Sequence, residues 1–278
     1  MQWHMGSEWT AMPDEQAVRY AREVARRAAA ELVGVTRAEY AGRPVRRAFF
    51  ERDGRRFALV PGGETEVGFD PERFEPTEAQ RASYEQSAED YELPGDLREY
   101  LALVTSPRRA VRVPATLVAV EPVVFTGRAP DEVPALLAET GTRLLTPDEW
   151  EYACGAGTGT LFRWGDDSPA DRLPGEAGET AEPGETAGPG GPGGGGEVVV
   201  ESPFGLAIAR DPYDLELTSD PRVLCGGDGG EAICGGYGRF LAWVPLAVAY
   251  RHPGLTDMLD EPDLYFDRLD ARPAIDVE

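Results

Sequence analysis

The sequence contains no lysine, because all 27 of its basic residues are arginines. Mechanisms that need a lysine side chain, such as Schiff-base catalysis or phosphate binding by a P-loop lysine, are therefore excluded. Histidine is almost as scarce, with only His4 and His252 in 278 residues. An iron site built from three histidines cannot be assembled from these two side chains.

Cysteine and long apolar runs are scarce as well. Cys154, Cys225 and Cys234 are too few for a disulfide framework, so we expect a cytoplasmic protein. No apolar run reaches the roughly 18 residues that a membrane-spanning helix needs, and the N-terminus lacks the apolar core of a secretory signal. We therefore expect no membrane span.

Positive charge is in short supply relative to negative charge. The chain carries 50 acidic residues and a formal net charge of −23 at pH 7. Nucleic acids and anionic membranes attract proteins with clustered positive charge, so neither is an expected partner. The expected ligand is instead a protein, a peptide or a small molecule.

Local patterns predict helices and strands along the same chain. An amphipathic stripe predicts a helix over residues 14–33, and Asp53-Gly54 between two apolar runs predicts a β-hairpin. Shorter patterns predict helices over 76–87, 93–104 and 131–140 and strands over 109–125. Residues 198–252 are rich in glycine and predict strands, and the apolar run 239–250 around Pro245 predicts buried core strands.

A strong helix-start signal lies in TPDEWEYACGAG, residues 146–157. Thr146 is placed to be the N-cap, Pro147 occupies the first helical position, and Glu149 follows three residues after the cap. This pattern predicts a capping box, in which two backbone amides are satisfied reciprocally. Gly155 and Gly157 predict that the helix ends after about two turns.

Two segments lack the composition of a folded core. Residues 174–197 consist almost wholly of glycine, proline, glutamate, alanine and threonine, and predict a disordered insertion. A linker between independent domains is the alternative, but SPFGL at 202–206 resumes the pattern that precedes the insertion. Residues 1–13 are interpreted as a tag or a disordered segment outside the fold.

Several landmarks together resemble the formylglycine-generating-enzyme superfamily, also called the sulfatase-modifying-factor family. They occur in family order and are FALVPGGETEVGFD (57–70), RLLTPDEWEYACGAG (143–157), FRWGDD (162–167), SPFGL (202–206), LELTSD (215–220) and RVLCGGDGG (222–230). The resemblance implies an α+β domain, related to the C-type-lectin fold, with much irregular structure. That domain would span 57–278, with a helix and hairpin extension at 14–56.

The resemblance also implies chemistry that the family performs with metals. Formylglycine-generating enzymes oxidise a substrate cysteine with oxygen, using two cysteines that bind Cu(I). The positions that match this pair hold Glu231 and Gly236 here. The stretch that contributes to a calcium site in relatives is replaced by DPYDLEL at 211–217. A related branch uses three-histidine iron, which this chain cannot form.

Two function hypotheses follow from these departures. The favoured hypothesis is a non-catalytic binding or scaffold module that recognises a protein, peptide or small-molecule ligand through its loops. The alternative is an oxygen-dependent oxidoreductase acting on a peptide or small molecule, with copper held as Cu(I) by Cys225 and Cys234 as candidate catalytic residues. Asp211 and Asp214 are candidate calcium ligands, because carboxylate oxygens suit that ion.

Overall fold

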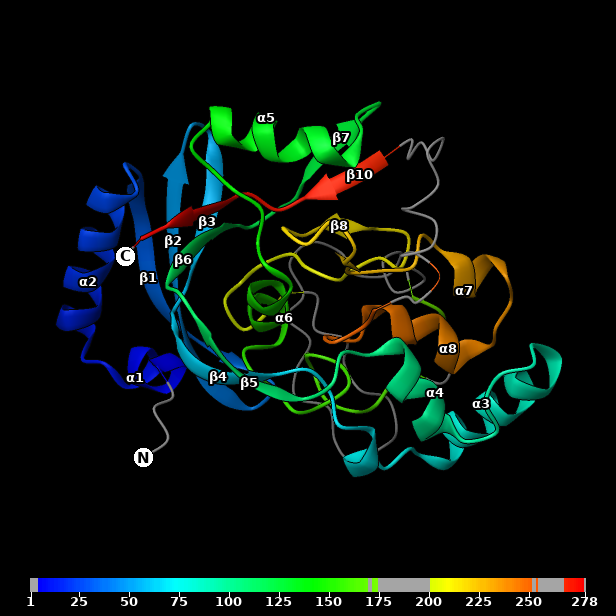
Figure 1. Cartoon of the computed structure of the whole chain (residues 1–278). Helices are drawn as coiled ribbons and strands as arrows, with labels where there is room; N and C mark the ends of the chain where they lie inside the picture. The colour runs from blue at the N-terminus through cyan, green and yellow to red at the C-terminus, as the bar shows by residue number, and fades with distance from the viewer. Residues whose placement is uncertain (1–4, 170–171, 175–200, 252–253, 255–267, 278) are drawn as a thin grey trace.

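The chain contains both helices and β-sheets, which confirms the α+β composition (Figure 1). The structure is a computed structural model, and it describes residues 5–169, 172–174, 201–251, 254 and 268–277. All but the first residue of the 174–197 insertion lies outside the described residues, as do His4 and His252. None of the described helices is both long and apolar enough to cross a membrane.

The largest sheet has five strands in the order β1-β2-β3-β6-β11, and all neighbouring strands are antiparallel. Its strands are β1 (Glu31–Tyr40), β2 (Arg43–Arg52), β3 (Arg55–Val60), β6 (Thr116–Ala119) and β11 (Ala274–Asp276). The predicted hairpin at Asp53-Gly54 is confirmed, since it joins β2 to β3. Both turn residues have positive φ, 53° and 72°, as a two-residue hairpin turn of type I′ requires.

The two faces of this sheet are covered by different elements. Side chains alternate between the faces of a strand, so Phe57 and Leu59 lie in one cluster and Ala58 and Val60 in another. The first cluster includes the buried face of helix α2 (Asp14–Arg27), and the second includes helix α6 (Pro147–Gly155). Figure 1 shows α2 outside the sheet and α6 on its inner side, near the centre of the molecule.

Helix α2 is shorter than the 14–33 that its apolar stripe predicts. The helix ends at Arg27 because Ala29 adopts a left-handed conformation, with φ of 50°. The chain then enters β1, which the sequence analysis missed and which pairs with β2 along its whole length. The predicted extension at 14–56 therefore supplies two strands of the main sheet.

Residues 1–13 also differ from the interpretation as a segment outside the fold. Met5–Ala11 forms helix α1, and the Trp9 side chain is buried in the cluster beneath α2. The indole Nε1 of Trp9 donates a hydrogen bond of 2.9 Å to the carbonyl oxygen of Arg46 in β2. This side chain packs as part of the core, not as a remnant.

A second sheet lies beside the first and has the order β7-β10-β8-β9. Its strands are β7 (Val123–Thr126), β8 (Glu216–Leu217), β9 (Leu224–Cys225) and β10 (Arg268–Ala271). Helix α5 (Val133–Glu139) packs on it through Val133 and Leu137. A separate two-stranded sheet pairs β4 (Gly63–Val67) with β5 (Arg109–Val113). The strands predicted over 109–125 are confirmed, since β5, β6 and β7 all lie in this range.

The remaining helices gather on the side of the molecule away from α2, as Figure 1 shows. They are α3 (Glu78–Asp90), α4 (Leu97–Val104), α7 (Glu231–Cys234) and α8 (Arg239–Trp243). Short 3-10 turns are found at Pro71–Arg73, at Val244–Leu246 after α8, and at Pro130–Glu132 directly before α5. The run 239–250 is buried as predicted, but the prediction of core strands is wrong. It forms α8 and a 3-10 turn, because a run buried on all sides has no periodicity that separates helix from strand, and Pro245 has no amide for a strand ladder.

Candidate functional site

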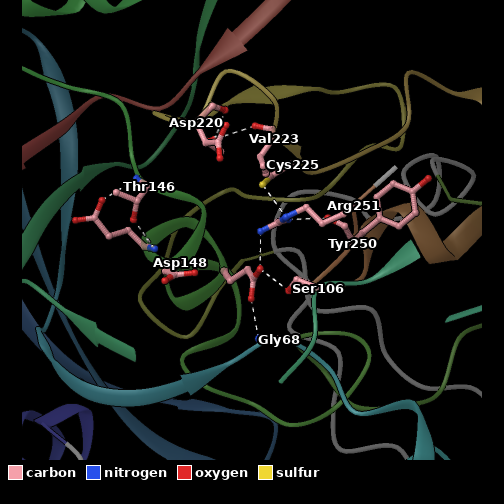
Figure 2. Close-up of polar contacts among 12 residues, drawn as sticks. Gly68, Ser106, Thr146, Asp148, Asp220, Val223, Cys225, Tyr250 and Arg251 are labelled. Carbon is pink, nitrogen blue, oxygen red and sulfur yellow. Dashed lines mark hydrogen bonds and ion pairs between the residues drawn. The ribbon is translucent and has the colours of Figure 1, made fainter. Parts of the chain in front are cut away.

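The predicted capping box at the start of α6 is confirmed. The Thr146 hydroxyl accepts a hydrogen bond of 3.2 Å from the Glu149 amide, and the Glu149 carboxylate accepts one of 2.8 Å from the Thr146 amide (Figure 2). The same carboxylate accepts two hydrogen bonds from Arg143, which also pairs with Asp276 of β11. The start of α6 is therefore tied to the edge strand of the main sheet.

One turn into α6, the buried carboxylate of Glu151 accepts hydrogen bonds from four donors. It accepts hydrogen bonds of 2.7 Å from the amide of Gly68 and from the hydroxyl of Ser106, and a charged hydrogen bond from Arg251 (Figure 2). The fourth donor is the Arg109 guanidinium, at 3.3 Å. A buried carboxylate is tolerated only when it is paired and hydrogen-bonded in this way. Glu151 thus joins α6 to the segments that flank β4 and β5.

Cys225 belongs to this same network. It lies in β9, is fully buried, and its Sγ accepts a hydrogen bond of 3.0 Å from Arg251 (Figure 2). Burial raises the pKa of the Cys225 thiol to about 12, although the nearby Arg251 charge acts in the opposite direction. At neutral pH the side chain is a protonated thiol, and binding Cu(I) would require it to release its proton in this buried position.

Cys234 has different surroundings. It is the last residue of α7, its side chain is exposed, and its Sγ lies 3.3 Å from the Tyr213 hydroxyl. One candidate cysteine is therefore in the core and the other on the surface, and their joint copper site stays a prediction. Cys154 lies in the core, and burial raises the pKa of its thiol to about 11.

The candidate calcium ligands lie in a tight turn. The Asp211 carboxylate accepts a hydrogen bond of 3.0 Å from the Tyr213 amide, and the Asp214 amide donates to the Asp211 carbonyl. Such an Asx turn stabilises a loop without any ion. Within the described ranges, no group of three or more His, Cys, Asp or Glu side chains is arranged to hold a metal ion. The calcium site likewise stays a prediction.

The Gly226-Gly227 pair after β9 has a packing role beside this turn. A Cβ atom on Gly227 would lie 2.1 Å from the carbonyl oxygen of Asp214 and 2.4 Å from that of Pro212. Asp228 follows, and its carboxylate accepts hydrogen bonds from the amides of Gly230 and Ala232 at the start of α7. Gly227 thus allows the backbones of two loops to touch, which a side chain at this position would prevent.

A cavity of about 430 Å³ lies on the other side of α6, near the N-terminal helix. We call it the α1–α6 cavity. It is bounded by α1, the turn between β1 and β2, the start of β4, the C-terminal end of α6 and the segments 163–165 and 203–204. Its aromatic lining residues are Trp9, Tyr40, Tyr152, Trp164 and Phe204. Small-molecule sites are concave, mostly apolar and typically about 300–1,000 Å³ in volume, so this cavity has the dimensions of one.

The end of α6 is shaped to form one wall of this cavity. Ala156 and Gly157 adopt left-handed conformations, with φ of 52° and 75°, and turn the chain away from the helix axis. A Cβ atom on Gly157 would lie 2.5 Å from the Thr65 hydroxyl oxygen, so glycine permits close contact between this turn and β4. The Thr158 and Thr160 hydroxyls, which hydrogen-bond each other at 2.6 Å, continue the wall.

The charged lining of the cavity is mainly positive. Arg43, Arg46 and Arg163 line it, and Glu64 is the acidic residue among its lining. Arg46 and Arg163 are buried, whereas Arg43 is exposed. Burial lowers the pKa of the Arg163 guanidinium below its usual range, but an arginine starts so high that it stays charged at neutral pH. The cavity therefore combines aromatic walls with fixed cations.

No protein-family model matches the chain, and no curated protein matches its sequence. Function must therefore be inferred from the geometry of this chain. Two arrangements are candidates for the functional site, namely the network around Glu151 and Cys225 and the α1–α6 cavity. The first is satisfied internally by its own hydrogen bonds, whereas the second offers space for a ligand.

Sequence reasoning missed the cavity almost completely. Trp9 was excluded with residues 1–13, Tyr40 lies in a strand that was not predicted, and Arg163 was noted only as part of FRWGDD. These residues lie more than 30 positions apart along the chain, so no local pattern links them. The available signal was the tryptophan at position 9, because a large aromatic residue is seldom left outside a core.

Proposed function

We propose that the chain is a formylglycine-generating-enzyme-like protein that acts as a non-catalytic binding module, with a small molecule or the end of a peptide held in the α1–α6 cavity. The single observation that carries the proposal is the cavity itself, which joins aromatic walls to buried guanidinium groups. Polar groups that converge beside aromatic side chains in a concave pocket are typical of ligand-binding sites. Nothing in this arrangement requires a metal or a redox-active thiol.

The family part of the proposal is supported by contacts between landmarks that lie far apart in the sequence. The indole of Trp150 in RLLTPDEWEYACGAG donates a hydrogen bond of 2.9 Å to Glu216 in LELTSD. The Tyr152 ring lies 5.5 Å from the Phe204 ring of SPFGL. Three landmarks that the resemblance identified separately thus meet around α6.

The alternative function, a copper-dependent oxidoreductase, finds no comparable support. It needs Cys225 and Cys234 to share one Cu(I) ion in a place that a substrate can reach, but Cys225 is fully buried and bonded to Arg251. We expect a Cu(I) titration against a competing chelator to give the same affinity for the parent, Cys225→Ser and Cys234→Ser. Tight one-to-one binding that both substitutions abolish would reverse the order of the two hypotheses.

The binding function is tested by screening small aromatic fragments, both neutral and charged, with ¹⁵N-labelled protein. Trp9 and Trp164 line the cavity and Trp150 does not, so the indole N–H signals report the location of any bound fragment. We expect some fragments to shift the Trp9 and Trp164 signals and to leave the Trp150 signal in place. A screen in which no fragment shifts either signal would contradict the proposal.

A pair of valine substitutions provides a matched control for this screen. Val45 of β2 is half-buried and lines the cavity, whereas Val33 of β1 is more than half exposed and lies outside the lining. We expect Val45→Trp to block fragment binding by filling the cavity and Val33→Trp to leave binding unchanged. Both variants keep a β-favouring side chain in a strand, so each is expected to fold.

A further inference from the structure

We infer that the ligand of the α1–α6 cavity is an aromatic acid, in which a carboxylate bound by the cavity arginines is joined to a ring held by the aromatic walls. The inference rests on the proposed binding function and names the chemical class of its ligand. The first observation concerns charge. Although the chain has a net charge of −23, the lining of this one cavity contains three arginines and one glutamate.

Arg46 supplies a buried cation whose hydrogen-bonding capacity is incompletely used. Its Nη2 donates to the Met12 carbonyl and at 2.9 Å to the Asp14 carboxylate, while the guanidinium carbon lies 5.5 Å from the centre of the Trp9 ring. Its Nε is buried and has no hydrogen-bond partner within the part of the chain that the structure describes. A buried donor without a partner costs about 1–3 kcal/mol, and this nitrogen is too deeply buried to meet a ligand directly, so Arg46 acts on the cavity through its fixed positive charge.

Arg163 is held rigidly at the same cavity. Its Nη1 donates a hydrogen bond of 2.8 Å to the Ala209 carbonyl, and its guanidinium lies over the Trp164 ring at 4.7 Å from the centroid. The Tyr40 hydroxyl donates to the Arg163 carbonyl oxygen at 3.2 Å and orients this part of the wall. A planar guanidinium that is fixed in place matches the two oxygens of a carboxylate, and little side-chain entropy remains to be lost.

The rest of the lining determines where each part of the ligand goes. The C-terminal end of α6 borders the cavity, and the C-terminus of a helix carries partial negative charge. The carboxylate is therefore expected beside the arginines and away from α6. The Tyr152 and Phe204 rings, 5.5 Å apart and inclined at 53°, offer the apolar surface on which an aromatic ring packs.

The test compares indole-3-acetate with its neutral isostere indole-3-acetamide, titrated into ¹⁵N-labelled protein while the Trp9 and Trp164 indole signals are followed. We expect the acid to bind at least about tenfold more tightly than the amide, the effect of one charge-assisted hydrogen bond. Equal affinities at these signals would overturn the acid class while the binding function stood. Displacement of the acid by equimolar inorganic phosphate would show that an oxyanion without a ring suffices, and would also overturn the inference.

Two arginine substitutions complete the experiment. Arg43 lies exposed among the cavity residues, so Arg43→Gln is expected to fold and to reduce the preference for the acid severalfold. Arg19 is exposed on α2 outside the lining, and Arg19→Gln changes the net charge equally, so it is expected to leave the preference unchanged. An equal loss in both variants would mean that only long-range charge matters and would contradict the inference. If neutral fragments occupy the cavity and indole-3-acetate does not, the acid class alone is wrong.

Discussion

At the scale of single residues, burial decides which side chains are reactive. Cys154 and Cys225 are fully buried, and burial raises their thiol pKa values to about 11 and about 12, whereas Cys234 is exposed. A thiol reacts only as its thiolate, so the raised pKa values keep the two buried thiols protonated and unreactive at neutral pH. Three cysteines that look equivalent in the sequence therefore differ in chemistry.

A thiol-labelling experiment tests this difference. We expect the native protein to react with one equivalent of an alkylating reagent at pH 7–9, and Cys234→Ser to react with none, because the two remaining thiols are buried and protonated. In denaturant, all three thiols of the parent are expected to react with the reagent. Labelling of Cys225 in the native state, identified by mass spectrometry, would show that the β9 strand opens and would restore the copper hypothesis.

Buried charge is the second feature of the residue scale. The Arg272 guanidinium forms a two-pronged pair with the Glu216 carboxylate, and both side chains are almost completely buried. The same carboxylate accepts the Trp150 indole hydrogen bond. Removing one partner leaves a charge buried without compensation, whereas an exposed pair such as Arg210–Glu121 contributes little.

We expect Glu216→Gln to lower the free energy of unfolding by about 3–5 kcal/mol, because it leaves the Arg272 charge uncompensated in the core. The matched control Glu121→Gln removes one partner of the exposed pair and is expected to change stability by less than about 1 kcal/mol. Urea denaturation followed by circular dichroism measures both. Similar losses in the two variants would mean that the buried pair is solvated in the native protein.

At the scale of secondary-structure elements, α6 shows how local signals and distant partners combine. The capping box of Thr146 and Glu149 was readable from the sequence, because its partners are three residues apart. The pairing of Glu149 with Arg143, and of Arg143 with Asp276 of β11, adds contacts that connect the helix to the sheet. The helix start is specified locally, and its position is set by a distant strand.

Replacement of the cap tests the local part of this arrangement. We expect Thr146→Ala to lower the free energy of unfolding by about 1 kcal/mol, because the Glu149 amide loses its acceptor. Thr146→Ser keeps a hydroxyl at the same position and is expected to retain most of that stability. If the serine variant loses as much as the alanine variant, packing of the threonine methyl group outweighs the cap.

Elements with local signals were predicted well and elements with non-local partners were not. The Asp53-Gly54 hairpin and the start of α6 depend on residues within a few positions of each other. The helix predicted over 14–33 runs into the first residues of β1, and the rest of this strand was not predicted. Strand β1 lies at the edge of the sheet and carries many polar residues, so its main signal is the pairing with β2, which no local pattern shows. The run 239–250 was read as strands for the related reason that a fully buried segment shows no alternation.

At the scale of the whole molecule, the N-terminal helix is part of the fold and of the candidate site. Trp9 is buried in the cluster between α2 and the main sheet and lines the α1–α6 cavity. Its indole hydrogen bond to Arg46 ties α1 to β2, and Arg46 returns a hydrogen bond to the Met12 carbonyl. The stability of the fold and the candidate site therefore share one side chain.

We expect Trp9→Ala to lower the free energy of unfolding by about 3 kcal/mol, because it empties a large buried site and removes the indole hydrogen bond. The neighbouring Glu8 is exposed, and Glu8→Ala is expected to change stability by less than about 0.5 kcal/mol. Thermal and urea unfolding measure both variants. If the stability of Trp9→Ala matched the parent, α1 would be a loosely attached segment and the cavity would lose one wall.

The sequence by itself determined the absence of lysine, the scarcity of histidine and cysteine, the hairpin and the capped helix α6. Each of these follows from composition or from residues within one turn of each other, where backbone geometry and short hydrogen bonds act. Only the tertiary structure decided that Cys225 is buried beside Arg251, that Cys234 is exposed, and that Trp9, Tyr40 and Arg163 line one cavity. Burial and cavities arise from contacts between segments far apart in the chain, and single-sequence patterns carry no record of those distances.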